Sequence, residues 1–289
     1  MSILSIIILN YNTKDLTIAC LKSLTENYKE ELKKEEYEII VVDNASTDGS
    51  VSEITKLLNK SNQKLIENQK NLGFTKGNNL AAKNAKGKYL FFLNSDTEVL
   101  DRGLVEMVDF MEKNQNVGIL GAKLLNTNGS SQKSAGRFLT VFNVLLMLLG
   151  GDLGFLRFSS KKIKNVDWVS GASMMISSGL FKKINGFDEN IFMYTEDMEI
   201  CYRIRKDGFE TFFYPRIKIV HKEIGSSNRS FAIVNIYKSL LYFYKKHRSV
   251  FELYIVKSML VLKAQILILI GTLSRNSYLT STYKKAIKF

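Results

Sequence analysis

The chain has 289 residues, of which 45% are hydrophobic, and a formal net charge of +13. This length and composition predict one large α/β domain with an appendage and argue against a disordered chain. The two cysteines, Cys20 and Cys201, lie far apart and outside any CxxC or Cys/His spacing. A disulfide framework and a structural zinc site are therefore disfavoured, and a reducing compartment fits best.

Short β-rich runs alternate with helical-length segments along the first half of the chain. The runs occupy residues 3–10, 37–43, 64–68 and 88–94, and residues 14–32 and 50–60 are of helical length. The first run lacks the basic leader of a signal peptide and passes directly into NYNTKD, so we interpret it as a strand. The alternation predicts a parallel, doubly wound sheet, which binds ligands at the carboxyl ends of its strands.

Polar side chains follow the first two predicted strands. LNYNT and VVDNASTDGS place Asn10, Asn12, Asp43, Asn44 and Asp48 at one rim. A carboxylate such as Asp43 can accept a hydrogen bond from the ring N–H of uracil or thymine. The same residues suit an Asx turn followed by a helix cap, and from the residues alone this alternative is preferred.

The next polar segment, NLGFTKGNN (residues 71–79), contains two glycines and Lys76. We expect a helix to begin near Asn79. Close approach of the backbone, a lysine and a helix N-terminus would suit a diphosphate. The sequence contains no Walker A loop and no GxGxxG, so the glycines alone are weak evidence.

Two aspartates stand at positions where a buried element meets polar sequence. KYLFFLNSDTEV runs through five apolar side chains and then reaches Asn94, Ser95 and Asp96, which could also cap a helix over residues 100–114. In TEDMEICYRIRKDG, helical spacing turns Asp197 inward, and buried carboxylates of this kind usually have a task. Simple helix-dipole complementarity in a first turn explains Glu196 better than Asp197.

The C-terminal segment is basic and apolar. Residues 229–289 carry eleven lysines and arginines and one acidic residue, Glu252, and their charges alternate with apolar runs. This pattern favours a surface that meets an anionic bilayer, with a solvated face of packed helices as the alternative. Residues 253–273 are long enough to cross a bilayer, but Lys257 and Lys263 interrupt them. We therefore expect a helix that lies in the membrane interface.

Five ordered segments carry a family resemblance: LNYN, VVDNASTDGS, residues 71–97, residues 171–208 and IVH. Together they resemble the family 2 glycosyltransferases, specifically the rhamnosyltransferase-like branch, over roughly residues 3–230. The resemblance implies an α/β GT-A fold, which is Rossmann-like with a mostly parallel mixed sheet flanked by helices. It implies a nucleotide-sugar-binding half in residues 1–115, an acceptor and catalytic half in residues 116–230, and a helical, membrane-associating extension in residues 231–289.

The implied activity is an inverting transfer from a dTDP- or UDP-sugar, with dTDP-rhamnose as one candidate. The acceptor would be a hydroxyl of a glycan or lipid-linked glycan in cell-surface polysaccharide synthesis. A metal-dependent nucleotide-sugar hydrolase would use the same donor site. A nucleic-acid-binding protein is disfavoured because the C-terminal aromatics lie in apolar runs. We expect a cytoplasmic enzyme that is peripheral on the inner face of the cell membrane. The sequence does not decide between a monomer and a homo-oligomer.

The resemblance also assigns roles to residues. NSD matches the D-x-D signature with Asn94 in place of the first aspartate, and Asp96 with His221 would hold Mg²⁺ or Mn²⁺ on the donor diphosphate. Asp197 would be the general base. The nucleotide-sugar site would comprise Asn10, Tyr11, Asn12, Asp43, Asn44, Asn71, Gly73, Lys76, Asn79, Asn94, Ser95 and Asp96.

The acceptor would meet a second set of residues: Trp168, Gly171, Ala172, Asp188 and Glu196. Trp168 could equally stack on a sugar or fill the core. The segment after His221 would close over the donor and bring Ser226, Ser227 and Arg229 near phosphate.

Overall fold

A mixed β-sheet forms the centre of the molecule. The structure, a computed structural model, describes residues 2–58, 60–150, 156–222 and 228–288. Within these residues the sheet has nine strands, which lie in the order β3 (Gln63–Glu67), β2 (Tyr37–Asp43), β1 (Leu4–Asn10), β4 (Tyr89–Asn94), β11 (Ser173–Ser177), β6 (Val117–Leu125), β12 (Glu210–His221) and β5 (Thr97–Val99), with β9 (Lys164–Val166) paired to β12.

The four predicted strands are confirmed as β1 to β4, and they run parallel to one another. After β4 the sheet becomes mixed, because β11 lies antiparallel to both β4 and β6, whereas β12 is parallel to β6. The carboxyl ends of β1, β2 and β4 therefore meet at one edge of the sheet. The polar segments that follow these strands are brought together there.

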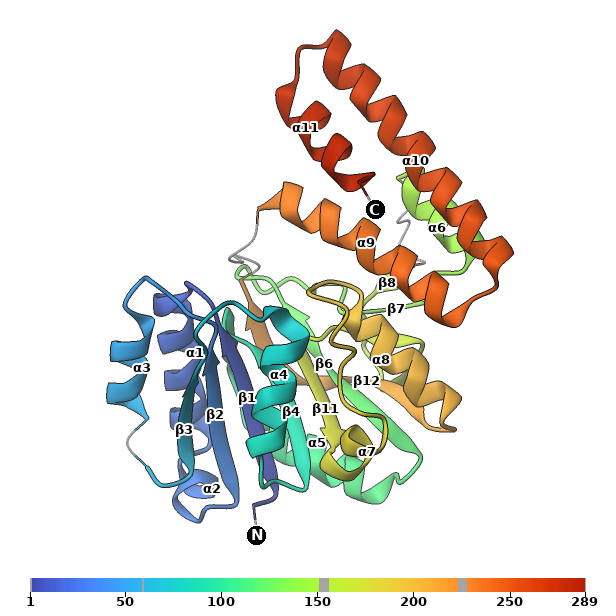
Figure 1. Cartoon of the computed structure of the whole chain (residues 1–289). Coiled ribbons are helices and arrows are strands. Elements are labelled where there is room, and N and C mark those ends of the chain that lie inside the picture. The colour runs from blue at the N-terminus through green and yellow to red at the C-terminus, as the bar shows by residue number, and fades with distance from the viewer. Residues whose placement is uncertain (1, 59, 151–155, 223–227, 289) are drawn as a thin grey trace.

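Helices cover both faces of the sheet (Figure 1). Ile6 and Ile8 of β1 belong to the core on one face, and Ile7 belongs to the core on the other. Burial on both faces explains why these strands are continuous apolar runs. The first face carries α1 (Lys14–Asn27), α2 (Lys29–Lys33), α3 (Ser50–Leu57) and α5 (Gly103–Lys113), and the second carries α4 (Gly73–Asn84), α7 (Ser178–Lys183) and α8 (Glu196–Lys206).

Two helix predictions were wrong. The helix expected over residues 14–32 is interrupted at Tyr28, whose buried phenol donates a hydrogen bond to the carbonyl of Asp101 at 2.9 Å. The helix expected to begin near Asn79 begins at Gly73, where φ is +80°. The loop that contains Phe192 docks on this first turn, since the Phe74 N–H donates to the Phe192 carbonyl at 2.8 Å.

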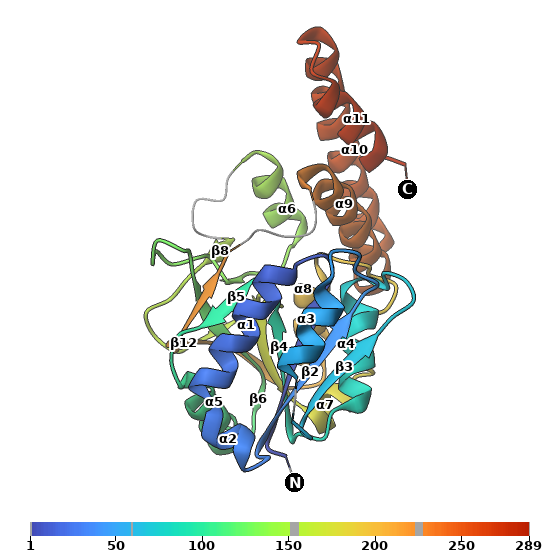
Figure 2. The same ribbon diagram turned by 90° about the vertical axis from the view of Figure 1, so that its left-hand side faces the viewer.

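A small second sheet lies beside the main one. It consists of β10 (Trp168–Val169), β7 (Ala135–Gly136) and β8 (Arg157–Phe158), all antiparallel. The helix α6 (Val141–Leu148) lies between β7 and β8 in the chain and projects above the domain (Figure 2).

Three helices end the chain: α9 (Arg229–His247), α10 (Val250–Leu273) and α11 (Ser277–Ala286). α9 crosses the domain near α8, whereas α10 and α11 project away from it (Figure 1). Leu240, Phe243 and Tyr244 of α9 are buried in the same core as the main sheet. The domain boundary near residue 230 stays a prediction, and α9 packs into the core of the main sheet. In the described chain, α10 is the one helix that is long and apolar enough to cross a membrane.

Candidate active site

A pocket of about 560 Å³ opens where β1, β2 and β4 end. Many predicted nucleotide-sugar residues line it, although they come from distant parts of the sequence. This convergence follows from the parallel order of the first strands. The lining residues that were predicted are Tyr11, Asn44, Asn71, Gly73, Asn94, Ser95, Asp96 and His221.

Asp96 and His221 lie side by side in this pocket. His221 Nε2 is 3.2 Å from Asp96 Oδ1, and both side chains are largely buried. Strand pairing explains the contact, because β12 runs antiparallel to β5 and sets His221 opposite Thr97, the residue after Asp96. Asp96 does not cap α5, since β5 separates it from that helix.

Gln132 fixes the orientation of the His221 ring. Its amide Nε2 donates to the His221 carbonyl at 2.6 Å, and its Oε1 lies 3.0 Å from His221 Nδ1. Because an amide oxygen only accepts hydrogen bonds, Nδ1 must carry a proton. Nε2 is then the ring nitrogen that faces Asp96, which is the usual second-sphere arrangement of a metal-binding histidine.

The donor set of this pair suits a divalent cation. Asp96 offers a hard carboxylate oxygen and His221 an imidazole nitrogen, which together favour Mn²⁺ over the strongly oxygen-preferring Mg²⁺. In the part of the chain that the structure describes, no group of three or more His, Cys, Asp or Glu side chains could hold a metal. Two protein ligands would leave positions for diphosphate oxygens.

Asp43 and Asn10 end the neighbouring strands β2 and β1, and they are not among the residues that line the pocket. β1 and β2 pair in the register that sets them opposite each other. Asp43 Oδ2 accepts from Asn10 Nδ2 at 2.6 Å, and Asp43 Oδ1 accepts from the Ser46 N–H at 2.8 Å. Both residues are almost completely buried. These contacts are those of the Asx turn that the sequence suggests as the alternative role of Asp43. The carboxylate still has lone pairs that can accept a hydrogen bond from a further donor.

Three other predicted nucleotide residues do not line the pocket. Asn12 is exposed and accepts from the Thr47 N–H at 2.8 Å. Lys76 is exposed on α4, because the helix begins earlier than expected. Asn79 is buried and both ends of its amide bind the backbone of Phe187, at 2.9 Å each. The predicted contacts of Lys76 and Asn79 with the nucleotide have no support in this geometry.

Asp197 lies in the first turn of α8, beside Gly171. Its Oδ1 accepts from the Met198 N–H at 2.8 Å, and its Oδ2 lies 3.4 Å from the Gly171 N–H. The side chain is partly buried and does not line the pocket, and its burial raises the pKa of the carboxyl group above the ordinary value. Burial and the neighbouring Asp197 charge also raise the pKa of Glu196. Among the described residues, Glu196 Oε2 has no hydrogen-bond partner.

The backbone before α8 is strained. Tyr194 and Thr195 have φ values of +69° and +65°, which place two consecutive residues with side chains in the left-handed region. Each such residue costs about 1–3 kcal/mol and persists only where the surrounding structure enforces it. Tyr194 lines the pocket directly before the two carboxylates. This strained turn therefore connects the pocket wall to Asp197.

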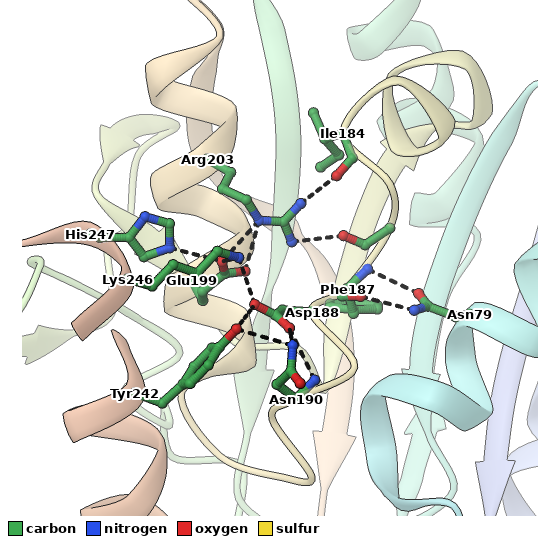
Figure 3. A network of polar contacts seen from close by, with 11 residues as sticks. Asn79, Ile184, Phe187, Asp188, Asn190, Glu199, Arg203, Tyr242, Lys246 and His247 are labelled. Carbon is green, nitrogen blue, oxygen red and sulfur yellow. Dashed lines mark hydrogen bonds and ion pairs between the residues drawn. The ribbon is translucent and has the colours of Figure 1, made fainter. Parts of the chain in front are cut away.

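A polar network around Glu199 holds α8 in place (Figure 3). Glu199 is fully buried, and its carboxylate contacts Arg203 Nε at 2.8 Å, Lys246 Nζ at 2.9 Å and His247 Nε2 at 2.9 Å. Burial alone would raise the pKa of Glu199, but the hydrogen bond from His247 and the Arg203 charge outweigh it and lower the pKa.

The same network fixes the loop before α8. Arg203 donates to the carbonyls of Ile184 and Gly186 at 2.6 and 2.7 Å. Asp188 accepts from Tyr242 Oη at 2.8 Å and from Lys246 Nζ at 2.5 Å (Figure 3). Although Asp188 is partly buried, these bonds hold its pKa far below the ordinary value. Asp188, predicted to meet an acceptor hydroxyl, instead binds α9.

Comparison with known proteins identifies the family. Residues 5–177 match the model described as glycosyl transferase family 2. The chain belongs to this family.

Curated relatives of this family 2 glycosyltransferase are named for the transfer of sugars. The low-salt glycan biosynthesis hexosyltransferase Agl10 of Haloferax volcanii is 26% identical over 242 residues, which cover 81% of this chain and 72% of the relative. Rhamnosyltransferase WbbL of Escherichia coli K12 is 28% identical over 169 residues, or 55% and 64% of the two chains. The chain spans only 20% of the poly(ribitol-phosphate) beta-glucosyltransferase of Bacillus spizizenii, at 38% identity over 128 residues.

Solved structures confirm the GT-A fold. Residues 1–349 of TarS from S. aureus superpose with a TM-score of 0.57 at 16% identity, over all of this chain and 90% of that one. GalNAc-T7 with UDP, GalNAc and Mn²⁺ gives a TM-score of 0.64 at 17% identity, over 84% of this chain and 50% of that one. At these identities the likeness establishes the fold of the glycosyltransferase.

Two predicted acceptor residues of the glycosyltransferase, Gly171 and Glu196, lie beside Asp197, whereas Trp168 and Asp188 lie elsewhere. Trp168 lies in the small sheet, where its indole N–H donates to the Arg137 carbonyl at 2.9 Å, and it does not line the pocket. Ala172 is buried and its carbonyl accepts from the Asn94 N–H at 3.0 Å. Ser226 and Ser227 lie outside the described residues, and Arg229 begins α9.

Sequence reasoning missed one wall of the pocket. This wall contains Phe192, Met193 and Tyr194 from the loop before α8, and Asn228 and Phe231 from the start of α9. The rings of Phe192 and Phe231 meet edge to face, with centroids 6.1 Å apart. The aromatic run NIFMY was visible in the sequence, but its position opposite α9 was not. The extension therefore contributes to the pocket itself.

Proposed function

We propose that the chain is an inverting, metal-dependent glycosyltransferase that uses a dTDP- or UDP-sugar, with dTDP-rhamnose as one candidate. The acceptor would be a hydroxyl of a glycan or lipid-linked glycan in cell-surface polysaccharide synthesis. The observation that carries the proposal is the Asp96–His221 contact in a pocket at the carboxyl edge of the sheet. The named activities of the relatives and the Mn²⁺ bound to structural neighbours support it.

The donor would lie along the carboxyl edge of the sheet. Its base would reach the β1–β2 rim, where Asp43 can accept from the ring N–H of a pyrimidine, and its diphosphate would reach Asp96. Asp96 and His221 would hold Mg²⁺ or Mn²⁺, which neutralises charge on the departing nucleoside diphosphate. Gln132 would keep His221 Nε2 directed toward this position, because it binds both Nδ1 and the backbone carbonyl of the histidine.

The acceptor would be activated by Asp197. As general base, its carboxylate would take the proton of the acceptor hydroxyl while the oxygen attacks the anomeric carbon opposite the leaving group, which inverts that centre. Burial supports this role, since a raised pKa makes the ionised carboxylate a stronger base. Glu196, adjacent and without a hydrogen-bond partner at Oε2 within the described residues, would orient the acceptor.

We place the enzyme in the cytoplasm, peripheral on the inner face of the cell membrane. Two features support this location: the apolar helix α10, and the excess of basic residues in the C-terminal segment. A lipid-linked acceptor would be presented at the same surface.

Donor choice and reaction class can be tested directly. Thermal unfolding with UDP-, dTDP- and GDP-sugars, each with and without Mn²⁺, should show metal-dependent stabilisation by the pyrimidine nucleotides. Product analysis should then show the anomeric configuration inverted and release of nucleoside diphosphate that depends on acceptor. Free sugar released at the same rate with and without acceptor would instead identify a nucleotide-sugar hydrolase.

A further inference from the structure

An exposed apolar patch lies on α6, a helix to which the sequence assigns no function. Phe142, Leu145 and Leu149 are 63%, 40% and 76% exposed, respectively, in α6 and its C-terminal cap. Large apolar side chains are costly to leave in water, and contiguous patches of them usually mark an interaction surface. The helix belongs to the catalytic half of the chain and not to the C-terminal extension.

A second apolar patch lies along α10. On one face Val256, Leu260, Ala264 and Gly271 are buried at helical spacing against the rest of the chain. The large apolar side chains on the exposed face are each between 46% and 76% accessible: Val250, Phe251, Tyr254, Leu262, Ile266, Leu269, Ile270 and Leu273. Because one face of α10 packs on the protein, the helix is better suited to lie on a bilayer than to cross it.

The two patches adjoin. α6 packs against α10, and Lys263 Nζ donates to the Leu148 carbonyl at the end of α6 at 2.7 Å. That bond uses one of the carbonyls that a helix C-terminus leaves without an internal partner, and it brings a cation to the negative end of the helix dipole. Both helices project on the side of the molecule where the strands of the site end (Figures 1 and 2). We call the exposed apolar residues of α6 and α10 the α6–α10 surface.

The charge around this surface indicates its partner. Residues 229–288 carry eleven lysines and arginines and one acidic residue, Glu252, whose carboxylate is bound in the capping box of α10. A second copy of the chain would bring the same positive charge and be repelled. An anionic bilayer offers both an apolar interior and opposite charge, about 1 kcal/mol per basic residue near the surface.

We propose that α6 and α10 together form one binding surface for an anionic lipid bilayer, in which α6 is a second anchor beside α10. This inference deepens, and rests on, the membrane location proposed above. Two anchors on separate helices fix the orientation of the domain on the membrane, which one helix does not.

The orientation brings the pocket next to the lipid. Phe231, in the first turn of α9, lines the pocket, and α9 packs against α10. A hydroxyl on a lipid-linked glycan would therefore reach the pocket from the bilayer side.

Vesicle binding of the full-length protein tests the inference. We compare wild type with two triple variants, Phe142→Ser/Leu145→Ser/Leu149→Ser and Leu262→Ser/Leu269→Ser/Leu273→Ser. The control is Leu100→Ser, since Leu100 is a 51% exposed leucine outside the surface. With phosphatidylcholine–phosphatidylglycerol vesicles, each triple variant should lose about tenfold or more in partition coefficient, and the control should bind as wild type. Vesicles of phosphatidylcholine alone should bind wild type weakly.

An α6 triple variant that binds anionic vesicles as well as wild type would overturn the proposal. So would equal binding of wild type to both vesicle types. Light scattering provides a further test, because it measures the oligomeric state of wild type and of the α6 triple variant. If wild type is a dimer and the variant is a monomer, the surface is an interface between two copies of the chain and the proposal fails.

Nucleotide binding without vesicles is measured on the same samples. Unchanged stabilisation by UDP and Mn²⁺ shows that a variant is folded. If wild type binds vesicles but no nucleotide, the donor proposal fails while the surface stands.

Discussion

Lys246 of α9 contacts Glu199 of α8 at 2.9 Å, inside the network that holds the helix carrying Asp197 (Figure 3). The same ammonium binds Asp188 at 2.5 Å, so it bridges the two segments on either side of the strained turn at Tyr194. The C-terminal extension thus contributes to the geometry of the proposed base.

Lys246→Met should lower turnover about tenfold with little change in donor affinity, because it loosens α8 without touching the donor. It should also reduce the free energy of unfolding by about 1–3 kcal/mol, since the buried Glu199 loses one of its hydrogen-bond partners. Kinetics and chemical denaturation measure the two effects. Lys245→Met, at the exposed neighbouring lysine, is the control, and equal turnover in both variants would remove Lys246 from this role.

Gln132→Leu should weaken Mn²⁺-dependent binding of nucleoside diphosphate about 10- to 100-fold, as expected when a second-sphere partner of a metal-binding histidine is lost. Titration calorimetry with and without Mn²⁺ checks this result. Metal-independent nucleotide binding serves as the control and should not change. If Gln132→Leu and Asp96→Ala both retain Mn²⁺-dependent binding of nucleoside diphosphate, Asp96 and His221 do not form a metal site.

Asp43→Ala should weaken uridine or thymidine nucleotides by about 1–3 kcal/mol through loss of the hydrogen bond to the base. The substitution also removes the partner of Asn10 and of the Ser46 N–H, so the fold is destabilised too. Competition against a purine nucleotide separates the two effects. An equal loss for both nucleotides would leave Asp43 as a turn residue.

The pKa of Asp197 predicts a pH dependence of stability. A carboxyl group whose pKa is raised in the folded protein binds its proton more tightly there than in the unfolded chain. Its contribution to the free energy of unfolding therefore falls as pH rises from the ordinary carboxyl pKa through the raised one. Relative to wild type, Asp197→Asn should gain stability between about pH 5 and about pH 8. Urea denaturation at the two pH values measures it, and an unchanged difference would contradict the raised pKa.

The donor edge of the site could be predicted from the sequence because its polar residues lie close together in short segments. A buried strand that ends in Asn94, Ser95 and Asp96 is visible in one short segment, and the parallel order of β1 to β4 follows from the alternation of elements. His221 was identified only by its place in the family pattern. Its contact with Asp96 depends on the pairing of β12 with the short strand β5, which no local signal predicts.

The other site residues depended on tertiary packing. Gln132 reaches His221 across 89 positions of sequence, and α9 supplies Phe231 to the pocket. Tertiary packing also explains why the start of α4 was predicted wrongly. The loop at Phe192 stabilises a helix that begins at Gly73 and not near Asn79. The burial of Leu240 and Phe243 also means that removal of residues 232–289 would disrupt the core. Point substitutions on the α6–α10 surface avoid that effect.

We propose that Asp197 is the base in sugar transfer from a donor bound in the Asp96–His221 pocket. The most direct test is the transfer rate of Asp197→Asn, measured with the dissociation constant of the donor in the presence of Mn²⁺. We expect an unchanged dissociation constant and a transfer rate about 10²- to 10⁴-fold lower. A variant that retains more than about a tenth of wild-type turnover at full donor saturation would contradict it.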